Sequence, residues 1–340
     1  MSAVLFVVLA AVIALVPVPY VTWSPGGTHD LLGQVDGRDV VSITGAETFP
    51  TSGQLRMTTV SVTSPTSSLS LPEVLFSYWL PSREVLPRVA VYRPGEEPTD
   101  ITEQETRLMN DAQSSAVVAG LRQSGVEVTT WPMVTSVSNS GPSSDILRPG
   151  DLIKAVDGKT TTTVQRVQEI IASHHVGEAV LFTVIRDGVV VRPTVTTRAT
   201  VNDPDKPIVG ITLDIGYSYG PTVRFSIDPA IGGSSAGLMF ALAIHDRLTR
   251  PELAAGQVIA GSGTVDAEGN VGPVGGVQEK IAGAARDGAT VFLLPKANCS
   301  DVGESTAGLR AVPVATLEEA VQALQQLADP KTAGSVAGCA

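Results

Sequence analysis

Two segments of this chain constrain its fold most, because each passes from a strand-like stretch through a glycine-rich turn into a helix-like stretch. The first is Val223–Leu248 (VRFSIDPAIGGSSAGLMFALAIHDRL), and the second is Gly261–Arg286 (GSGTVDAEGNVGPVGGVQEKIAGAAR). Glycine gives the backbone the freedom that such a turn requires. Each segment therefore predicts a strand, a turn and a helix in succession.

Ser234 and Ser235 stand where the first of these helices begins, directly after Gly232 and Gly233. The unpaired N–H groups and the positive dipole end of a helix N-terminus can stabilise a developing oxyanion, so a serine there can act as a nucleophile. A serine at such a position more often only caps the helix. Taken alone, this segment favours the cap.

Lys280 lies in the second helix beside Val277, Ile281 and several alanines. A lysine can act as a general base only if it is largely neutral near pH 7, and burial among apolar groups lowers its pKa in that direction. The alternative is a solvated lysine paired with a nearby acid, which is the usual state of a lysine on a helix.

Together the two segments resemble the Lon-type serine-lysine peptidases. In that family the nucleophile opens a helix within a (P/S)-S-A-G string, and the base follows in a G-x-V-x-P-(V/I)-G-G-x-x-E-K string. Ser235 matches the nucleophile, and Lys280 ends the matching stretch GNVGPVGGVQEK. The resemblance spans about residues 205–330. It implies acyl transfer by a Ser-Lys dyad without a metal or cofactor.

The resemblance also implies supporting roles for neighbouring residues. An ungapped alignment back from Lys280 puts Ser262 at the hydroxyl position that orients the lysine, and Gly233 and Ser234 directly precede the nucleophile. Two positions depart from the family pattern: Ser234 replaces a common Pro, and Gly232 replaces an Asp that ATP-dependent members often carry. A Ser-His-Asp triad built on His245 is the weaker alternative.

Residues 125–200 resemble a PDZ domain of the kind attached to bacterial proteases. The stretch LRPGDLIKAVDG predicts a strand at Leu152–Val156 and a tight Asp157-Gly158 turn, and a helix at Val164–Ala172 and a hairpin at Asp187-Gly188 follow. The resemblance implies a groove that accepts an extended peptide by strand addition. The alternative is a structural β-domain that binds no peptide.

The N-terminal segment Ala3–Val21 is apolar apart from the Tyr20 hydroxyl. As a helix it would span about 28 Å, close to the thickness of a bilayer core, and Tyr20 and Trp23 suit the interface beyond it. We expect a signal anchor here. A cleaved signal peptide and a buried core helix are the alternatives. No Lys or Arg precedes the run, so the positive-inside rule gives almost no orientation.

Composition excludes some partners. With 23 Lys+Arg against 34 Asp+Glu the chain carries a net charge of −11, and no cationic cluster is present that could bind nucleic acid. The two cysteines, Cys299 and Cys339, are too few for a zinc site and either form one disulfide or remain two thiols. No G-x-x-x-x-G-K-[ST] string occurs, so nothing in the sequence indicates an ATPase module.

We therefore predict an α+β multi-domain protein similar to membrane-anchored bacterial proteins that combine a PDZ domain with a Lon-type domain. The expected parts are a transmembrane anchor (1–23), a linker at 24–37 within a β-rich region that ends in a helix (24–124), a PDZ-like domain (125–200), a Lon-type α/β domain (205–330) and a tail (331–340). The expected function is ATP-independent cleavage of proteins or peptides by a single-pass membrane protein, with its folded domains extracytoplasmic. By analogy with Lon-type rings it would form a homo-oligomer. The alternative is a catalytically silent scaffold that holds protein partners at the membrane.

Overall fold

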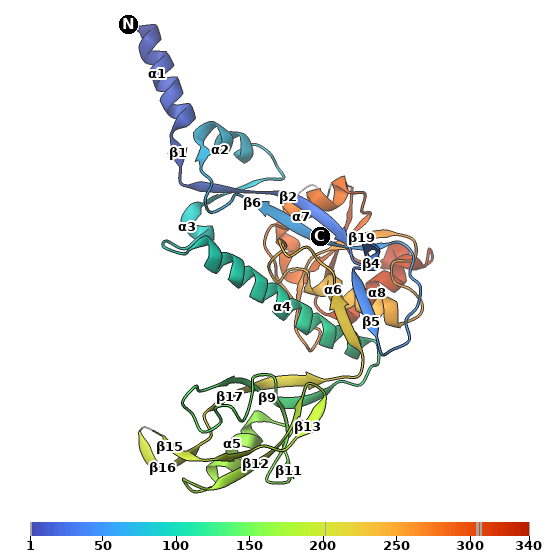
Figure 1. The fold of residues 1–340 in the computed structure, drawn as a ribbon. Helices are drawn as coiled ribbons and strands as arrows, with labels where there is room; N and C mark the ends of the chain where they lie inside the picture. Colours follow the sequence, from blue (N-terminus) through green and yellow to red (C-terminus); the bar gives the residue numbers. More distant parts are fainter. Residues whose placement is uncertain (1, 201, 304–305, 307, 340) are drawn as a thin grey trace. The chain divides into compact units, whose positions relative to one another are not determined.

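The computed structural model describes residues 2–200, 202–303, 306 and 308–339, so Met1 and Ala340, the ends of the first and last expected parts, lie outside it. The chain divides into two compact units. One comprises Met1–Val126 together with Pro221–Ala340, and the other comprises Glu127–Gly220. The second unit is therefore an insertion in the sequence of the first. In Figure 1 the early blue segments and the late orange segments accordingly lie side by side in one unit.

The first unit is built on a six-stranded sheet in the order β23-β22-β19-β6-β2-β8. The strands are β2 (Tyr20–Asp30), β6 (Gln54–Val62), β8 (Glu84–Pro87), β19 (Val258–Gly261), β22 (Val291–Pro295) and β23 (Arg310–Val314). β19 runs parallel to both β6 and β22, and β2 is antiparallel to β6 and β8. The pairing of β6 with β19 joins the two halves of this unit across the insertion. All five residues of β22 are buried, as expected for a strand covered on both faces.

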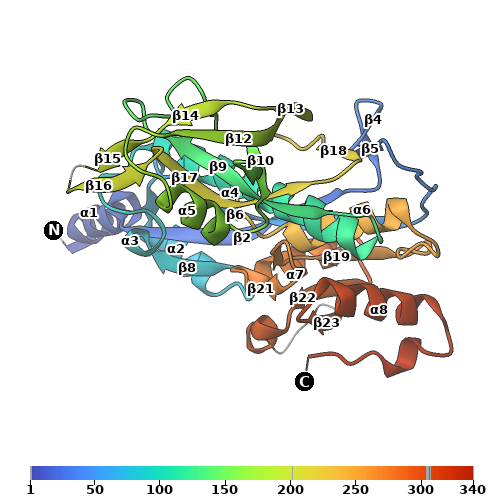
Figure 2. The same cartoon turned by 90° about the horizontal axis from the view of Figure 1, so that it is seen from below.

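Four helices pack around this sheet: α4 (Pro98–Gln123), α6 (Gly237–Leu248), α7 (Val277–Arg286) and α8 (Leu317–Ala328). α7 packs on β2 and β6, while α4 packs along α6. A Cβ on Gly120 of α4 would lie 2.9 Å from the Ala241 carbonyl oxygen, so the close approach of α4 and α6 depends on this glycine. Figure 2 shows α8 beside β22 and β23, near the C-terminus.

Shorter elements complete the first unit. The two-stranded pairs are β1 (Pro17–Val18) with β7 (Leu69–Ser70), β3 (Gln34–Val35) with β4 (Arg38–Asp39), β5 (Val41–Thr44) with β18 (Thr222–Phe225), and β20 (Thr264–Val265) with β21 (Val271–Gly272). The short helices are α2 (Leu71–Tyr78), α3 (Arg88–Val91), η1 (Lys296–Asp301) and η2 (Ala333–Ser335).

The second unit is a β-domain with one helix. Its main sheet contains β9 (Thr129–Val137), β10 (Leu152–Val156), β11 (Lys159–Thr160), β12 (Ala179–Arg186), β13 (Val189–Val191), β14 (Thr194–Thr196) and β17 (Ile211–Ser218), and β15 (Arg198–Thr200) pairs with β16 (Asp203–Ile208). The predicted strand and the predicted helix, α5 (Val164–Ala172), are confirmed with the same bounds. Both predicted Asp-Gly turns adopt positive φ, at 49° and 74° for Asp157-Gly158 and at 49° and 78° for Asp187-Gly188.

The N-terminus differs from the prediction. The helix α1 covers only Ser2–Leu15, 14 residues or about 21 Å, and Pro17 then begins a short strand. No helix in the described ranges combines the length and apolar character needed to cross a bilayer, so the predicted transmembrane helix is not supported.

The predicted linker at residues 24–37 is wrong as well. Residues 24–30 belong to β2, which pairs with β6 and β8 inside the six-stranded sheet. Trp23, which we expected at a membrane interface, lies half-buried in this strand. The compact unit that contains residues 221–330 accordingly also includes the chain before residue 126.

Candidate active site

Ser235 lies just before the N-terminus of α6, where the N-cap residue is Ala236. No side chain caps this helix, so the capping role considered for Ser234 and Ser235 is not seen. The backbone N–H groups of Ser235 and Ala236 find no hydrogen-bond partner among the described residues. Free N–H groups at a helix start can hold a developing oxyanion. Ser234 is half-buried, and its carbonyl oxygen accepts a 3.4 Å hydrogen bond from Gly237 N.

The Gly232-Gly233 turn before the serines is shaped by α4. Gly233 has a φ of +91°, and its N–H donates to the Glu105 carbonyl oxygen over 3.1 Å. A Cβ on Gly232 would lie only 2.5 Å from Glu105 Cβ, so this position cannot carry a side chain without moving the helix. Gly232 stands where family members often carry an Asp, and its lack of a side chain leaves room for Glu105. Sequence reasoning did not identify Glu105.

Lys280 is buried in α7, with 4% of its surface exposed. Burial lowers the pKa of its ammonium group to about 8, and the negative charge of Glu279 opposes this shift. Among the described residues no carboxylate forms an ion pair with it, so the alternative of a solvated, paired lysine is wrong. The helix begins after Gly276, which has a φ of +68° and packs against the Trp23 ring.

Ser262 connects the lysine to the nucleophile segment. Lys280 Nζ donates to Ser262 Oγ over 3.0 Å, and Ser262 Oγ donates to the Ser235 carbonyl oxygen, also over 3.0 Å. The same carbonyl accepts from Gly263 N at 2.8 Å. No hydrogen bond joins Lys280 Nζ directly to Ser235 Oγ within the part of the chain that the structure describes.

Ser235 and Lys280 line one cleft of about 520 Å³ in the first unit. Residues of β6 and α4 form other parts of its wall, so both halves of this unit contribute to it. Most of the lining is apolar or uncharged. Lys280 and Glu105 are the charged side chains among the residues that line it. A cleft with few charges and a mixed apolar and polar lining suits an extended peptide.

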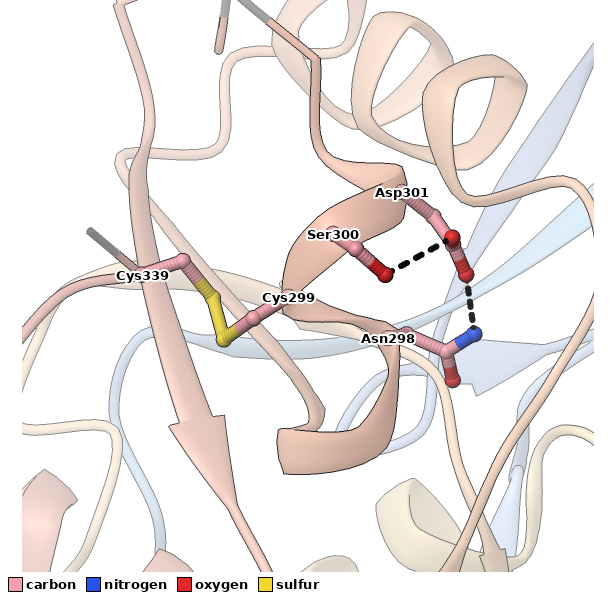
Figure 3. Close-up of a disulfide and its surroundings, with 5 residues drawn as sticks. All are labelled: Asn298, Cys299, Ser300, Asp301 and Cys339. Atoms are coloured by element: carbon pink, nitrogen blue, oxygen red, sulfur yellow. Dashed lines mark hydrogen bonds between the residues drawn. A yellow bond between two sulfur atoms is a disulfide. The ribbon is translucent and has the colours of Figure 1, made fainter.

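A disulfide joins Cys299 in η1 to Cys339 near the C-terminus (Figure 3). Asn298 precedes Cys299 in η1, and its Nδ2 also donates to Asp301 over 2.7 Å. Its side chain accepts from Val274 N and donates to the Val274 carbonyl oxygen, each over 2.9 Å. Val274 lines the cleft. The sequence left open whether the two cysteines form a disulfide or remain thiols, and the structure shows the disulfide.

His245 does not take part in this site. It is buried on α6, where burial lowers its imidazole pKa, and its Nδ1 lies 3.2 Å from Ser124 Oγ. Its hydroxyl neighbour is therefore Ser124 and not Ser235, so the geometry gives a Ser-His-Asp triad no support.

Comparison with known proteins yields two family matches. Residues 115–197 match the family model of the PDZ domain, and residues 229–326 match that of the Lon protease (S16) C-terminal proteolytic domain. The PDZ match begins within α4 and ends before β17, whereas the compact unit is Glu127–Gly220.

Curated relatives agree with the second match. An archaeal Lon protease from Methanocaldococcus jannaschii is 42% identical over 91 residues, which are 27% of this chain and 14% of that protein. A Lon protease from Roseiflexus castenholzii is 35% identical over 101 residues, 29% of this chain and 12% of that protein. The chain thus spans only a small part of the length of these relatives.

Among solved structures, the PDZ domain of an SdrC-like protein from Listeria monocytogenes is 28% identical. The match covers 24% of this chain and 86% of that domain's chain, with a TM-score of 0.23.

Proposed function

We propose that this chain, which carries a PDZ domain followed by a Lon-type serine peptidase domain, is an ATP-independent endopeptidase with Ser235 as nucleophile and Lys280 as general base. The observation that carries the proposal is the buried lysine, with its pKa lowered to about 8, in the same cleft as a serine at a helix N-terminus. A buried lysine without an ion-pair partner is costly to maintain, and catalysis is a reason to retain it.

The reaction follows from these groups. Neutral Lys280 takes the Ser235 hydroxyl proton as Oγ forms a bond to the peptide carbonyl carbon, and the free N–H groups at the start of α6 bind the oxyanion. The ammonium of Lys280 then gives its proton to the leaving amine as the C–N bond breaks. Water next attacks the acyl-enzyme, with Lys280 again as base, and releases Ser235. This requires Ser235 Oγ to come within hydrogen-bond reach of Lys280 Nζ.

The direct test is hydrolysis of an unfolded protein by purified full-length chain without nucleotide. We expect Ser235→Ala and Lys280→Ala each to reduce the rate at least a thousandfold while leaving the far-ultraviolet circular dichroism unchanged. Ser114→Ala and Lys296→Ala are matched controls, because they change exposed residues of the same types outside the cleft. Activity retained by both cleft variants would refute the dyad. A rate that requires added ATP would refute ATP independence.

We infer that the PDZ domain selects substrates. A groove of about 790 Å³ runs between α5 and residues 206–213, and Gln168, Ile171 and Ala172 line its helix side. Its partly apolar lining and adjacent strand suit an extended peptide. Ala172 is exposed, so Ala172→Trp should fill the groove without disturbing the core. The expected result is weaker cleavage of protein substrates at unchanged cleavage of short peptides.

The N-terminal helix supports a proposal of membrane attachment. Its side chains from Ala3 to Leu15 are exposed and carry no charge, which is unfavourable in water and favourable in a bilayer. The disulfide fits an oxidising compartment and hence an extracytoplasmic location. Flotation with phospholipid vesicles tests attachment: the full chain should float, and a variant that lacks residues 2–15 should not. Labelling of a cysteine introduced near Gly158 by an impermeant probe on intact cells tests the location.

A silent scaffold is the second candidate, and one observation favours it: Ser235 Oγ and Lys280 Nζ are not hydrogen-bonded to each other. In that case Ser235→Ala would leave the cellular phenotype unchanged, while Ala172→Trp would abolish it.

A further inference from the structure

Two side chains that line the proposed catalytic cleft carry charge, and they differ in their exposure to solvent. Lys280 is buried and hydrogen-bonded to Ser262. Glu105 is exposed to solvent on α4, so a molecule that enters the cleft can reach it. The remaining lining is apolar or neutral, with Leu108 and Met109 following Glu105 on the same side of the helix.

The Glu105 carboxylate lies next to the nucleophile turn. A Cβ placed on Gly233 would be 3.1 Å from Glu105 Oε2, and one placed on Gly232 would be 3.2 Å from it. These glycines directly precede Ser234 and Ser235. The carboxylate therefore lies close to where a substrate must pass to reach Ser235.

This carboxylate has no partner of its own. No hydrogen bond or ion pair of its side chain occurs within the described ranges, and partial burial raises the pKa of its carboxyl group. The nearest cation along the helix, Arg107, pairs with Glu103 and does not line the cleft. A partly desolvated, unpaired carboxylate gains most from a cation that brings its own hydrogen-bond donors.

We propose that Glu105 is a specificity-determining residue that binds the lysine or arginine side chain of a substrate, with apolar substrate residues beside it. This rests on the proposed peptidase function. The cation would lie against the Gly232-Gly233 turn, and the apolar residues would contact Leu108, Met109 and the β6 side of the cleft. Preferred substrates would carry an isolated basic residue within a hydrophobic stretch.

Paired peptides test this with the full-length protein. Each pair is identical except for lysine or uncharged norleucine at one position, and the position is scanned on both sides of the cleaved bond. At one position we expect kcat/KM for the lysine peptide to exceed that for norleucine roughly tenfold, a preference that falls to about one in Glu105→Gln. Glu105→Lys should favour a glutamate peptide instead. Glu103→Gln, on the same helix but outside the cleft, should keep the wild-type preference.

Binding of the same peptides to Ser235→Ala separates the two proposals. If peptides bind with the lysine preference but wild type cleaves none, the peptidase function fails and the Glu105 subsite stands. If wild type cleaves peptides without a lysine preference at any position, or if Glu105→Gln keeps the preference, the Glu105 subsite is refuted while the peptidase function stands.

Discussion

Lys280 Nζ donates a hydrogen bond to Ser262 Oγ over 3.0 Å, and Ser262 in turn donates to the backbone carbonyl of Ser235. One hydroxyl thus fixes the direction of the proposed base and its position relative to the nucleophile segment. Ser262 is 1% exposed, so water does not readily replace it. We expect Ser262 to position Lys280, because its hydroxyl bonds to Lys280 and to the Ser235 carbonyl oxygen.

Removing this hydroxyl should affect catalysis more than binding. We expect Ser262→Ala to lower kcat roughly 10- to 100-fold with little change in KM, because Lys280 loses its direction. The acceptor also stabilises the ammonium form, so its loss should lower the pKa of Lys280 further and move the pH profile to lower pH. Ser262→Thr, which keeps the hydroxyl, should restore part of the rate. A reduced rate with an unmoved pH profile would contradict the positioning role.

Activity should rise with pH. Because the pKa of Lys280 is about 8, roughly a tenth of the lysine is neutral at pH 7. We expect kcat/KM for an uncharged peptide to increase about tenfold per pH unit below pH 8 and to level off above it. Lys296→Ala should show the same profile. A flat profile between pH 6 and 9 would rule out Lys280 as the titrating base.

The buried lysine should reduce stability near neutral pH. Its pKa falls from 10.5 in the unfolded chain to about 8 in the folded one, which corresponds to roughly 3 kcal/mol. Between these values the unfolded chain binds more protons, so stability rises with pH across the window from about 8 to 10.5, and the full cost remains below pH 8. Lys280→Met should therefore raise the free energy of unfolding at pH 7 by about 1–3 kcal/mol while abolishing activity.

Urea unfolding at several pH values measures this effect. The stability gain of Lys280→Met should diminish above pH 8 and vanish near pH 10.5. If Lys280→Met is less stable than wild type at pH 7, the lysine stabilises the fold and the prediction is wrong.

The disulfide should stabilise both the tail and the cleft. Cys299 and Cys339 are 40 residues apart, and closing such a loop contributes about 2–4 kcal/mol. Cys339→Ser should lower the free energy of unfolding by this amount. It should also lower kcat, because η1 carries Asn298, which holds Val274 at the cleft. Reductant should lower the free energy of unfolding and the kcat of wild type in the same way, and should leave both values of Cys339→Ser unchanged. Wild type that is insensitive to reductant would contradict this role.

Local signals allowed parts of the fold to be predicted closely. The strand β10 and the helix α5 were predicted with their observed bounds, because an Asp-Gly turn ends one and Thr163 caps the other. The residues of the proposed dyad could be named because each lies in a long, family-like string. That their side chains line one cleft follows from the folding of the chain and is visible only in the structure.

Long-range pairing left no such signal. β2 contains Pro25, Gly26 and Gly27, which suggested a linker, yet its register shifts between Pro25 and Thr28 where it follows β6. A Cβ on Gly26 would lie 2.3 Å from Thr59 Oγ1, so the glycine is needed inside the strand. β6 finds its other partner, β19, about 200 residues later. Glu105 was missed for a similar reason, since only the packing of α4 brings it to the cleft.

The insertion of the PDZ domain into the peptidase unit also sets the order in which the two can form during synthesis. Strands β2 and β6 leave the ribosome first, but β19, the segment with Ser235 and the helix with Lys280 follow only after residue 220. The inserted unit, whose strands pair with one another, is complete by then. A nascent chain therefore contains the whole inserted domain before it contains both walls of the cleft. The cleft can form only after the segment with Lys280 has been synthesised.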